Sequence, residues 1–265
     1  MTGSGFPIHA TYYGKGPRRA LAIHCTLAHS GAWRGVAEHL GDRLSITAFD
    51  LPGHGKSGDW GGERELHDIA TEAALAFLDA PMDLIGHSFG ATVALRLAVT
   101  HPERVRSLTL IEPVLFAAAL ADTPERVAAF ERQAADFRKA MEMGDAMLSA
   151  RLFNRLWGDG TPWKDLPEVL RAYMAQRMDL IAGEGPVLYD DAAGMMRPGV
   201  LARASMPTVL IEGARSLDVV DAIDAALERR LPDARRVVIA GAGHMAPITH
   251  PREVADAIGA LLEVS

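Results

Sequence analysis

The sequence lacks the features that would indicate a disulfide-stabilised, membrane-spanning or nucleic-acid-binding protein. Its 265 residues include one cysteine, Cys25, so the chain can form no internal disulfide and no cysteine-rich metal site. No stretch approaches about eighteen uninterrupted apolar residues, which excludes a transmembrane helix. The net charge is −7, without blocks of like charge, so we expect neither nucleic acid nor a membrane as a partner. Of the function classes considered, chemistry on a small molecule is the one that these absences do not exclude.

The first sixteen residues mix Gly, Pro, His and Tyr, and they show no basic segment followed by an apolar one. This start does not resemble a signal peptide, and with the single cysteine it predicts a cytoplasmic location. The length and a hydrophobic content of 49% fit one main domain with an insertion. The composition does not indicate an oligomeric state.

Short apolar, β-branched segments alternate with helical patterns over most of the chain, which predicts βα units around a mainly parallel central sheet flanked by helices. An additional first segment, ending at the turn-like residues 14–17, predicts an antiparallel edge strand. The expected strands are residues 8–13, 20–24, 45–50, 82–85, 107–111, 208–211 and 236–239.

The alternation stops between residues 116 and 203, where helical periodicity continues without a convincing strand. Thr123 followed by Pro124 predicts a helix start, and apolar residues then recur at spacings of three and four up to Met141. Further helices are expected at 145–157 and 167–181. We therefore predict an α/β core formed by residues 1–115 and 204–265, with an inserted helical cap at 116–203.

A Gly-His-Ser-Phe-Gly motif at residues 86–90 lies directly between an expected strand and an expected helix. In this setting a G-x-S-x-G motif forms a strained turn that raises the serine hydroxyl above the sheet. The start of the following helix also stabilises negative charge that develops nearby. Ser88 is therefore the candidate nucleophile.

The chain resembles the α/β-hydrolase family over nearly its whole length, apart from the cap. The loop from His24 to Trp33, the D-x-P-G-H-G-x-S pattern at residues 50–57, Ser88, and the Gly-Ala-Gly-His segment at 241–244 follow the family's order. The resemblance implies the α/β-hydrolase fold and identifies His244 as the general base that activates Ser88.

The third member of the expected triad, the acid, has two candidates. Many family members carry an aspartate in a Gly-x-x-Asp segment after the penultimate strand, but here that position holds Ser216 and Asp218 comes two residues later. Related enzymes, including some haloalkane dehalogenases, instead carry the acid after the strand that follows the nucleophile helix, which corresponds to Glu112. A carboxylate at the end of a central strand is costly to bury without a partner. Glu112 is the first candidate and Asp218 the alternative.

Acyl transfer also requires donors directed at the tetrahedral oxyanion. The resemblance implies the backbone N–H of Phe89 and a second N–H in the early loop, from Thr26 or, because Cys25 replaces the usual glycine, from Leu27. The methionine-rich and aromatic cap predicts a mainly hydrophobic pocket. Its expected lining residues are Leu27, His29, Trp157 and Met245.

These residues predict a carboxylesterase-like serine hydrolase that cleaves a carboxylic ester, lactone or thioester through an acyl-enzyme on Ser88, without a metal or an organic cofactor. Serine-dependent hydrolysis of carbon–carbon bonds in ring-fission diketones is an alternative, as is a haloperoxidase-like side activity. A non-catalytic ligand sensor on the same fold is a third. Haloalkane dehalogenase and epoxide hydrolase chemistry require an aspartate nucleophile and are disfavoured.

Overall fold

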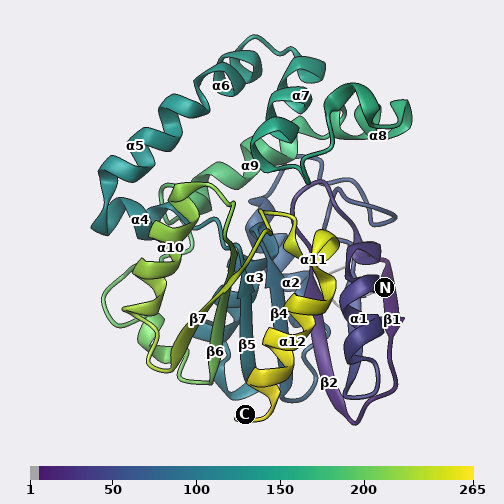
Figure 1. The fold of residues 1–265 in the computed structure, drawn as a ribbon, viewed down its shortest axis with the longest axis vertical. Helices are drawn as coiled ribbons and strands as arrows, with labels where there is room; N and C mark the ends of the chain where they lie inside the picture. The colour runs from purple at the N-terminus through teal and green to yellow at the C-terminus, as the bar shows by residue number, and fades with distance from the viewer. Residues whose placement is uncertain (1–5) are drawn as a thin grey trace.

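A computed structural model describes residues 6–265 (Figure 1). Residues 1–5 lie outside the described residues. They are the start of the segment used for the signal-peptide prediction and of the first part of the expected core. No helix between residues 6 and 265 has the length and apolar character needed to cross a membrane.

From residue 6 onward the chain forms a seven-stranded sheet in the order β1-β3-β2-β4-β5-β6-β7. β1 pairs antiparallel with β3, and every other neighbouring pair is parallel. The predicted fold class is therefore confirmed, and the strand ends differ from the expected ones by no more than two residues. The strands are β1 (Ala10–Tyr13), β2 (Arg18–Ile23), β3 (Leu44–Phe49), β4 (Met82–His87), β5 (Val105–Ile111), β6 (Thr208–Gly213) and β7 (Ala234–Ile239).

Helices cover both faces of the sheet because successive residues of the central strands point to opposite sides. In β2, Leu21 and Ile23 join the apolar cluster formed with α2 (Leu66–Leu75), α3 (Phe89–Thr100) and α10 (Asp218–Glu228). Ala20 and Ala22 join the opposite cluster, formed with α1 (Arg34–Leu40), α11 (Ala246–Thr249) and α12 (Pro251–Leu262).

Six helices between residues 116 and 188 lie over the carboxyl ends of the strands (Figure 1). The expected continuous helix from Pro124 divides at Ala134, and the expected helix at 167–181 divides at Arg177. Neither break contains a glycine or a proline, and the apolar periodicity continues across both. The sequence pattern therefore does not indicate either break. The helices are α4 (Phe116–Asp122), α5 (Pro124–Gln133), α6 (Ala135–Glu142), α7 (Ala146–Trp157), α8 (Glu168–Ala175) and α9 (Met178–Leu188), and short 3₁₀ turns span Ser30–Trp33, Pro102–Arg104, Trp163–Asp165 and Leu201–Arg203.

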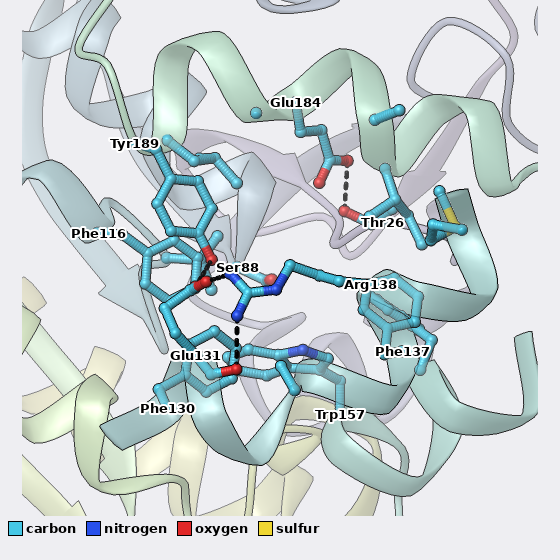
Figure 2. A pocket seen from close by; sticks show the side chains of 18 of the residues that line it. Thr26, Ser88, Phe116, Phe130, Glu131, Phe137, Arg138, Trp157, Glu184 and Tyr189 are labelled. Atoms are coloured by element: carbon cyan, nitrogen blue, oxygen red, sulfur yellow. Dashed lines mark hydrogen bonds and ion pairs between the residues drawn. The ribbon is translucent and has the colours of Figure 1, made fainter. Parts of the chain in front are cut away.

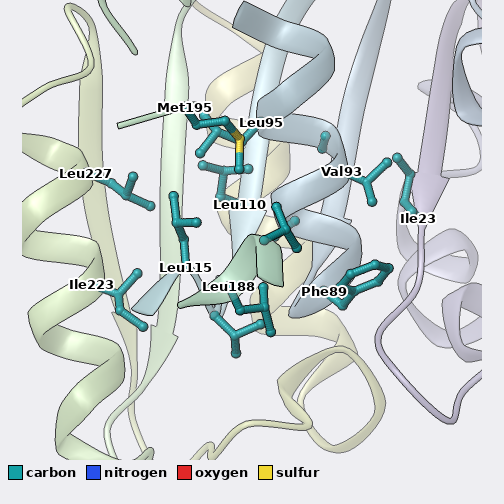
Figure 3. Close-up of a cluster of buried hydrophobic side chains, with 14 of the residues drawn as sticks. Ile23, Phe89, Val93, Leu95, Leu110, Leu115, Leu188, Met195, Ile223 and Leu227 are labelled. Carbon is teal, nitrogen blue, oxygen red and sulfur yellow. The ribbon is translucent and has the colours of Figure 1, made fainter. Parts of the chain in front are cut away.

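The helical region shares its base with the core of the sheet domain. Leu188 at the end of α9 and Met195 belong to the same buried cluster as Leu110 of β5 and Ile223 of α10 (Figure 3). Burying such apolar surface is the main favourable contribution to folding. Residues of α4, α5, α7 and α9 thus join the core cluster, whereas α6 and α8 contribute to a separate apolar cluster around Ala150, Met174 and Met178.

Candidate active site

Ser88 occupies a sharp turn between β4 and α3, with φ 56° and ψ −121°. Few non-glycine residues adopt a positive φ, and neighbouring structure must impose it. A side chain at Gly86 would overlap Ala91, and one at Gly90 would overlap the carbonyl oxygens of Ile23 and His24. The two flanking glycines therefore allow the close approach that this turn requires.

Three buried side chains form a continuous line at the carboxyl ends of the strands. Ser88 Oγ lies 3.0 Å from His244 Nε2, and His244 Nδ1 lies 3.2 Å from Glu112 Oε2. His87 Nε2 donates to the backbone carbonyl of His244 at 2.8 Å. Burial and the nearby His244 hold the pKa of His87 well below its usual value, so His87 remains a neutral donor. These contacts hold the loop after β7 against the Ser88 turn.

Glu112 follows β5 directly, with φ 50°, and its side chain is fully buried. Oε1 accepts hydrogen bonds from the backbone N–H of Gly213 at 2.6 Å and from the Ser216 hydroxyl at 2.5 Å. Ser216, at the position where related sequences often carry the acid, thus supplies a donor to a carboxylate that comes from another strand. These bonds compensate the cost of burying the charge.

Asp218 lies elsewhere, in the first turn of α10, where its side chain is 79% exposed. It accepts a hydrogen bond from Arg126 Nε of α5 at 2.8 Å. Of the two candidate acids, the structure brings Glu112 to His244 and pairs Asp218 with an arginine of the helical region.

The early loop after β2 is anchored by His24, a buried imidazole whose pKa burial lowers to about 3. Its Nδ1–H donates to the Cys25 carbonyl at 2.7 Å, and Nε2 accepts from the N–H of Leu51 at 2.9 Å. Burial also raises the pKa of the Cys25 thiol to about 12, so this thiol stays protonated. The anchored loop brings Thr26 to the cavity above Ser88, while Phe89 is the buried first residue of α3.

A cavity of about 440 Å³ opens above Ser88 and is enclosed mainly by α4 to α7 and α9 (Figure 2). Phe116 stacks on Phe130 and Tyr189, with ring centroids 5.2 Å and 4.5 Å apart. Trp157 packs edge-on against His244 at 4.6 Å. The remaining apolar lining residues are Val114, Ala134, Phe137, Met141, Phe153, Ile181, Ala182, Gly185 and Leu188.

Of the four residues expected in the pocket, Trp157 lines the Ser88 cavity. Leu27, His29 and Met245 instead line a second cavity, also about 440 Å³, which shares Thr26, Phe153 and Trp157 with the first. The three shared residues lie between the two cavities, and the loop turns at Leu27 with φ 63°. His29 is exposed, and its Nδ1 accepts a hydrogen bond from the N–H of Gly31 at 3.0 Å.

Five polar residues that line the Ser88 cavity were not expected from the sequence: Glu131, Arg138, Glu142, Glu184 and Tyr189. Arg138 forms an ion pair with Glu131, whose Oε1 also accepts a hydrogen bond from the Tyr189 hydroxyl at 2.9 Å. Glu184 of α9 accepts one from the Thr26 hydroxyl at 2.5 Å. Their positions in the sequence could have indicated some of them. Glu131 and Arg138 lie four residues after apolar positions of one helix face, and Glu184 interrupts an apolar helix. Within residues 6–265, no cluster of three or more His, Cys, Asp or Glu side chains is arranged to hold a metal.

The sequence pattern of the alpha/beta hydrolase family matches residues 20–257, which is most of the chain. The chain belongs to the alpha/beta hydrolase family. This hydrolase is 30% identical over 271 aligned positions to Lipase LipV of Mycobacterium tuberculosis, covering 95% of this chain and 96% of the relative. It is also 30% identical over 268 positions to the pimeloyl-[acyl-carrier protein] methyl ester esterase of Nitrosomonas europaea, covering 96% and 99%.

Solved structures share the architecture of this hydrolase at lower sequence identity. A bromoperoxidase from Bacillus anthracis has a TM-score of 0.71 at 19% identity, covering 97% of this chain and 96% of its own. The 2-hydroxy-6-oxo-6-phenylhexa-2,4-dienoate hydrolase from Rhodococcus sp. strain RHA1 has a TM-score of 0.69 at 21% identity, covering 98% and 95%. At these identities the likeness establishes the fold alone.

Proposed function

We propose that this hydrolase cleaves the carboxylic ester, lactone or thioester bond of a small, mainly apolar substrate. Ser88 acts as the nucleophile, His244 as the general base, and Glu112 as the carboxylate that orients His244. The observation that carries the proposal is the unbroken line from Glu112 through His244 to Ser88, which ends at the wall of an apolar cavity. The two relatives named above as a lipase and a methyl ester esterase favour ester bonds as the target.

In the first half of the proposed reaction, His244 Nε2 removes the hydroxyl proton as Ser88 Oγ attacks the substrate carbonyl carbon. The N–H groups of Phe89 and Thr26 donate to the resulting oxyanion. His244 then returns the proton to the departing alcohol or thiol, which leaves an acyl group on Ser88. In the second half, water attacks this acyl group with the same proton transfers. Throughout, Glu112 accepts the Nδ1–H of His244 and stabilises the imidazolium.

Pre-steady-state kinetics with p-nitrophenyl esters of increasing acyl length tests the proposal. We expect a burst close to one p-nitrophenolate per protein, followed by steady turnover. Ser88→Ala should abolish both phases, while Ser205→Ala, at an exposed serine far from Ser88 in the sequence, should retain them.

Two results would contradict the proposal. A single release without turnover would favour the ligand sensor. Turnover of a ring-fission diketone without any ester cleavage would favour carbon–carbon bond hydrolysis.

A further inference from the structure

Glu184 is a buried carboxyl group in the wall of the Ser88 cavity, with 4% of its surface exposed. Its neighbours on α9 that line the same cavity, Ile181, Ala182 and Leu188, are apolar. A leucine at this position would avoid the cost of removing a carboxyl group from water. The carboxyl group of Glu184, among these apolar residues of α9, therefore needs a partner that compensates the cost of its burial.

The protein supplies only part of that compensation. Oε1 of Glu184 accepts the hydrogen bond from the Thr26 hydroxyl at 2.5 Å, and among residues 6–265 no arginine, lysine or histidine forms an ion pair with it. Burial raises the pKa of Glu184 to about 8, so the group is mostly protonated at neutral pH. A protonated carboxyl group offers one O–H donor besides its acceptor positions.

Three other polar residues of the cavity already have partners. Tyr189 and Arg138 both contact Glu131, and Ser88 contacts His244. Figure 2 shows Glu184 on the opposite side of the cavity from the Glu131 and Arg138 pair, with one oxygen directed to Thr26 and the other left toward the interior. Of the buried polar side chains that line this cavity within residues 6–265, Ser88 and His244 bond to each other, and Glu184 keeps one carboxyl oxygen without a protein partner.

We propose that Glu184 binds a neutral hydrogen-bond acceptor of the substrate, such as an ether, ketone or second ester oxygen. This inference rests on the proposed function and narrows its substrate class. Because Glu184 adjoins Thr26, which borders the same cavity as Ser88, the acceptor lies a short way along the substrate from the bond that is cleaved. The substrate is therefore an apolar ester with an oxygen at a defined position, rather than a plain hydrocarbon ester.

Matched p-nitrophenyl esters test this assignment. In each pair one methylene group of the acyl chain is replaced by an ether oxygen, and the position of the oxygen is moved along the chain. At the preferred position we expect the wild-type kcat/KM to exceed that of the hydrocarbon ester by about tenfold, as one added hydrogen bond allows.

Two substitutions separate recognition of the substrate from support of the loop. Glu184→Gln keeps an N–H donor for the substrate and an acceptor for Thr26, so we expect it to retain the preference. Glu184→Leu should abolish or reverse the preference while the hydrocarbon ester is still cleaved, and Glu184→Met is the second apolar variant if leucine prevents folding. Glu168→Leu, at an exposed glutamate of α8, is the matched control.

The inference is overturned if the wild type and the apolar variant show an equally large preference for the ether ester. A uniform loss of kcat for every ester would also overturn it, because Glu184 would then only support Thr26. So would a stronger preference for an ammonium-bearing ester, which would indicate an ionised carboxylate. If the wild type cleaves no ester, the proposed function fails separately, and calorimetric binding of the same ester pairs to Ser88→Ala decides whether Glu184 still recognises the oxygen.

Discussion

Glu112 of the core and Glu184 of the helical cap are both buried carboxyl groups, and they differ in how completely the protein satisfies them. Glu112 contacts the N–H of Gly213, the hydroxyl of Ser216 and the imidazole of His244. Glu184 receives one hydrogen bond, from Thr26. The protein therefore supplies three partners to the carboxyl group of Glu112 and one to that of Glu184, which is the difference on which both proposals rest.

The backbone shows the same contrast. The N–H of Ser88 donates to Ile111, and that of Glu112 donates to Ile211, so both positive-φ residues are held by the ends of the strand ladder. At Gly185 of α9, by comparison, nothing lies within 4 Å of the position that a side chain would take. Strand pairing therefore holds Ser88 and Glu112 closely, whereas the cavity wall at Gly185 has space for an added side chain.

The largest expected effect would break the difference between the two candidate acids. Glu112→Gln should lower kcat by about 10³–10⁴-fold, because a neutral amide stabilises neither the required tautomer nor the imidazolium of His244. Asp218→Asn should keep kcat within about twofold, since Asp218 is exposed and paired with Arg126. Steady-state kinetics on the best ester checks both variants, and the opposite ranking would assign the acid to Asp218.

Next in size is a pair of glycine substitutions that compares the packing of core and cap. Gly90→Ala should destabilise the protein by about 3 kcal/mol or more, because the new methyl group meets the backbone of Ile23 and His24. Gly185→Ala meets no other heavy atom outside its own helix backbone and chain neighbours, but its methyl group conflicts with Pro186, which offsets the gain in helix propensity, so the stability should change by no more than about 1 kcal/mol. Urea unfolding measures both. Equal losses of stability would show that the helical region at Gly185 is packed as tightly as the Ser88 turn at Gly90.

Glu184 should also make stability depend on pH. Its folded-state pKa of about 8 lies above the unfolded value, so the folded state binds the proton more tightly. Its stabilising contribution is complete below the unfolded pKa of about 4.3 and is lost as pH rises toward 8. Between pH 5 and 7 the wild type should lose roughly 2 kcal/mol relative to Glu184→Gln. Parallel curves of unfolding free energy against pH would contradict this assignment.

The smallest expected effect concerns the ion pairs between α5 and α10. Arg126 donates to Asp218 at 2.8 Å and to Asp221 at 2.6 Å, and all three side chains are partly exposed. Arg126→Met should therefore cost about 1 kcal/mol or less in low salt, and less still in high salt. Thermal unfolding at two salt concentrations measures this, and a large loss independent of salt would show that Arg126 supports packing instead.

The sequence predicted the core well because its signals are local. The β-branched segments identified the strands, and the glycines at 86 and 90 identified the turn around Ser88, since each signal depends on a few adjacent residues. The choice between Glu112 and Asp218 stayed open for a different reason. It depends on where the loop after β6 directs Ser216 and Asp218, which spacing along the chain does not determine.

The cavity was harder to predict than the core. Leu27, His29 and Met245 were expected beside Trp157 in one pocket, but they line a second cavity that meets the first at Thr26, Phe153 and Trp157. The apolar helix around Glu184 distinguishes this residue locally, but nothing local indicates its partner, because Thr26 lies 158 residues away in the sequence. Contacts of this range arise from the packing of cap on core rather than from any local pattern.

Labelling with a fluorophosphonate probe, followed by peptide mass spectrometry, tests the central claim most directly, because the probe requires an activated serine. The arrangement of Ser88, His244 and Glu112 predicts one adduct per chain, located on Ser88 and formed far more slowly in His244→Ala. An unlabelled Ser88 in folded protein, or an adduct on a different residue, would contradict it.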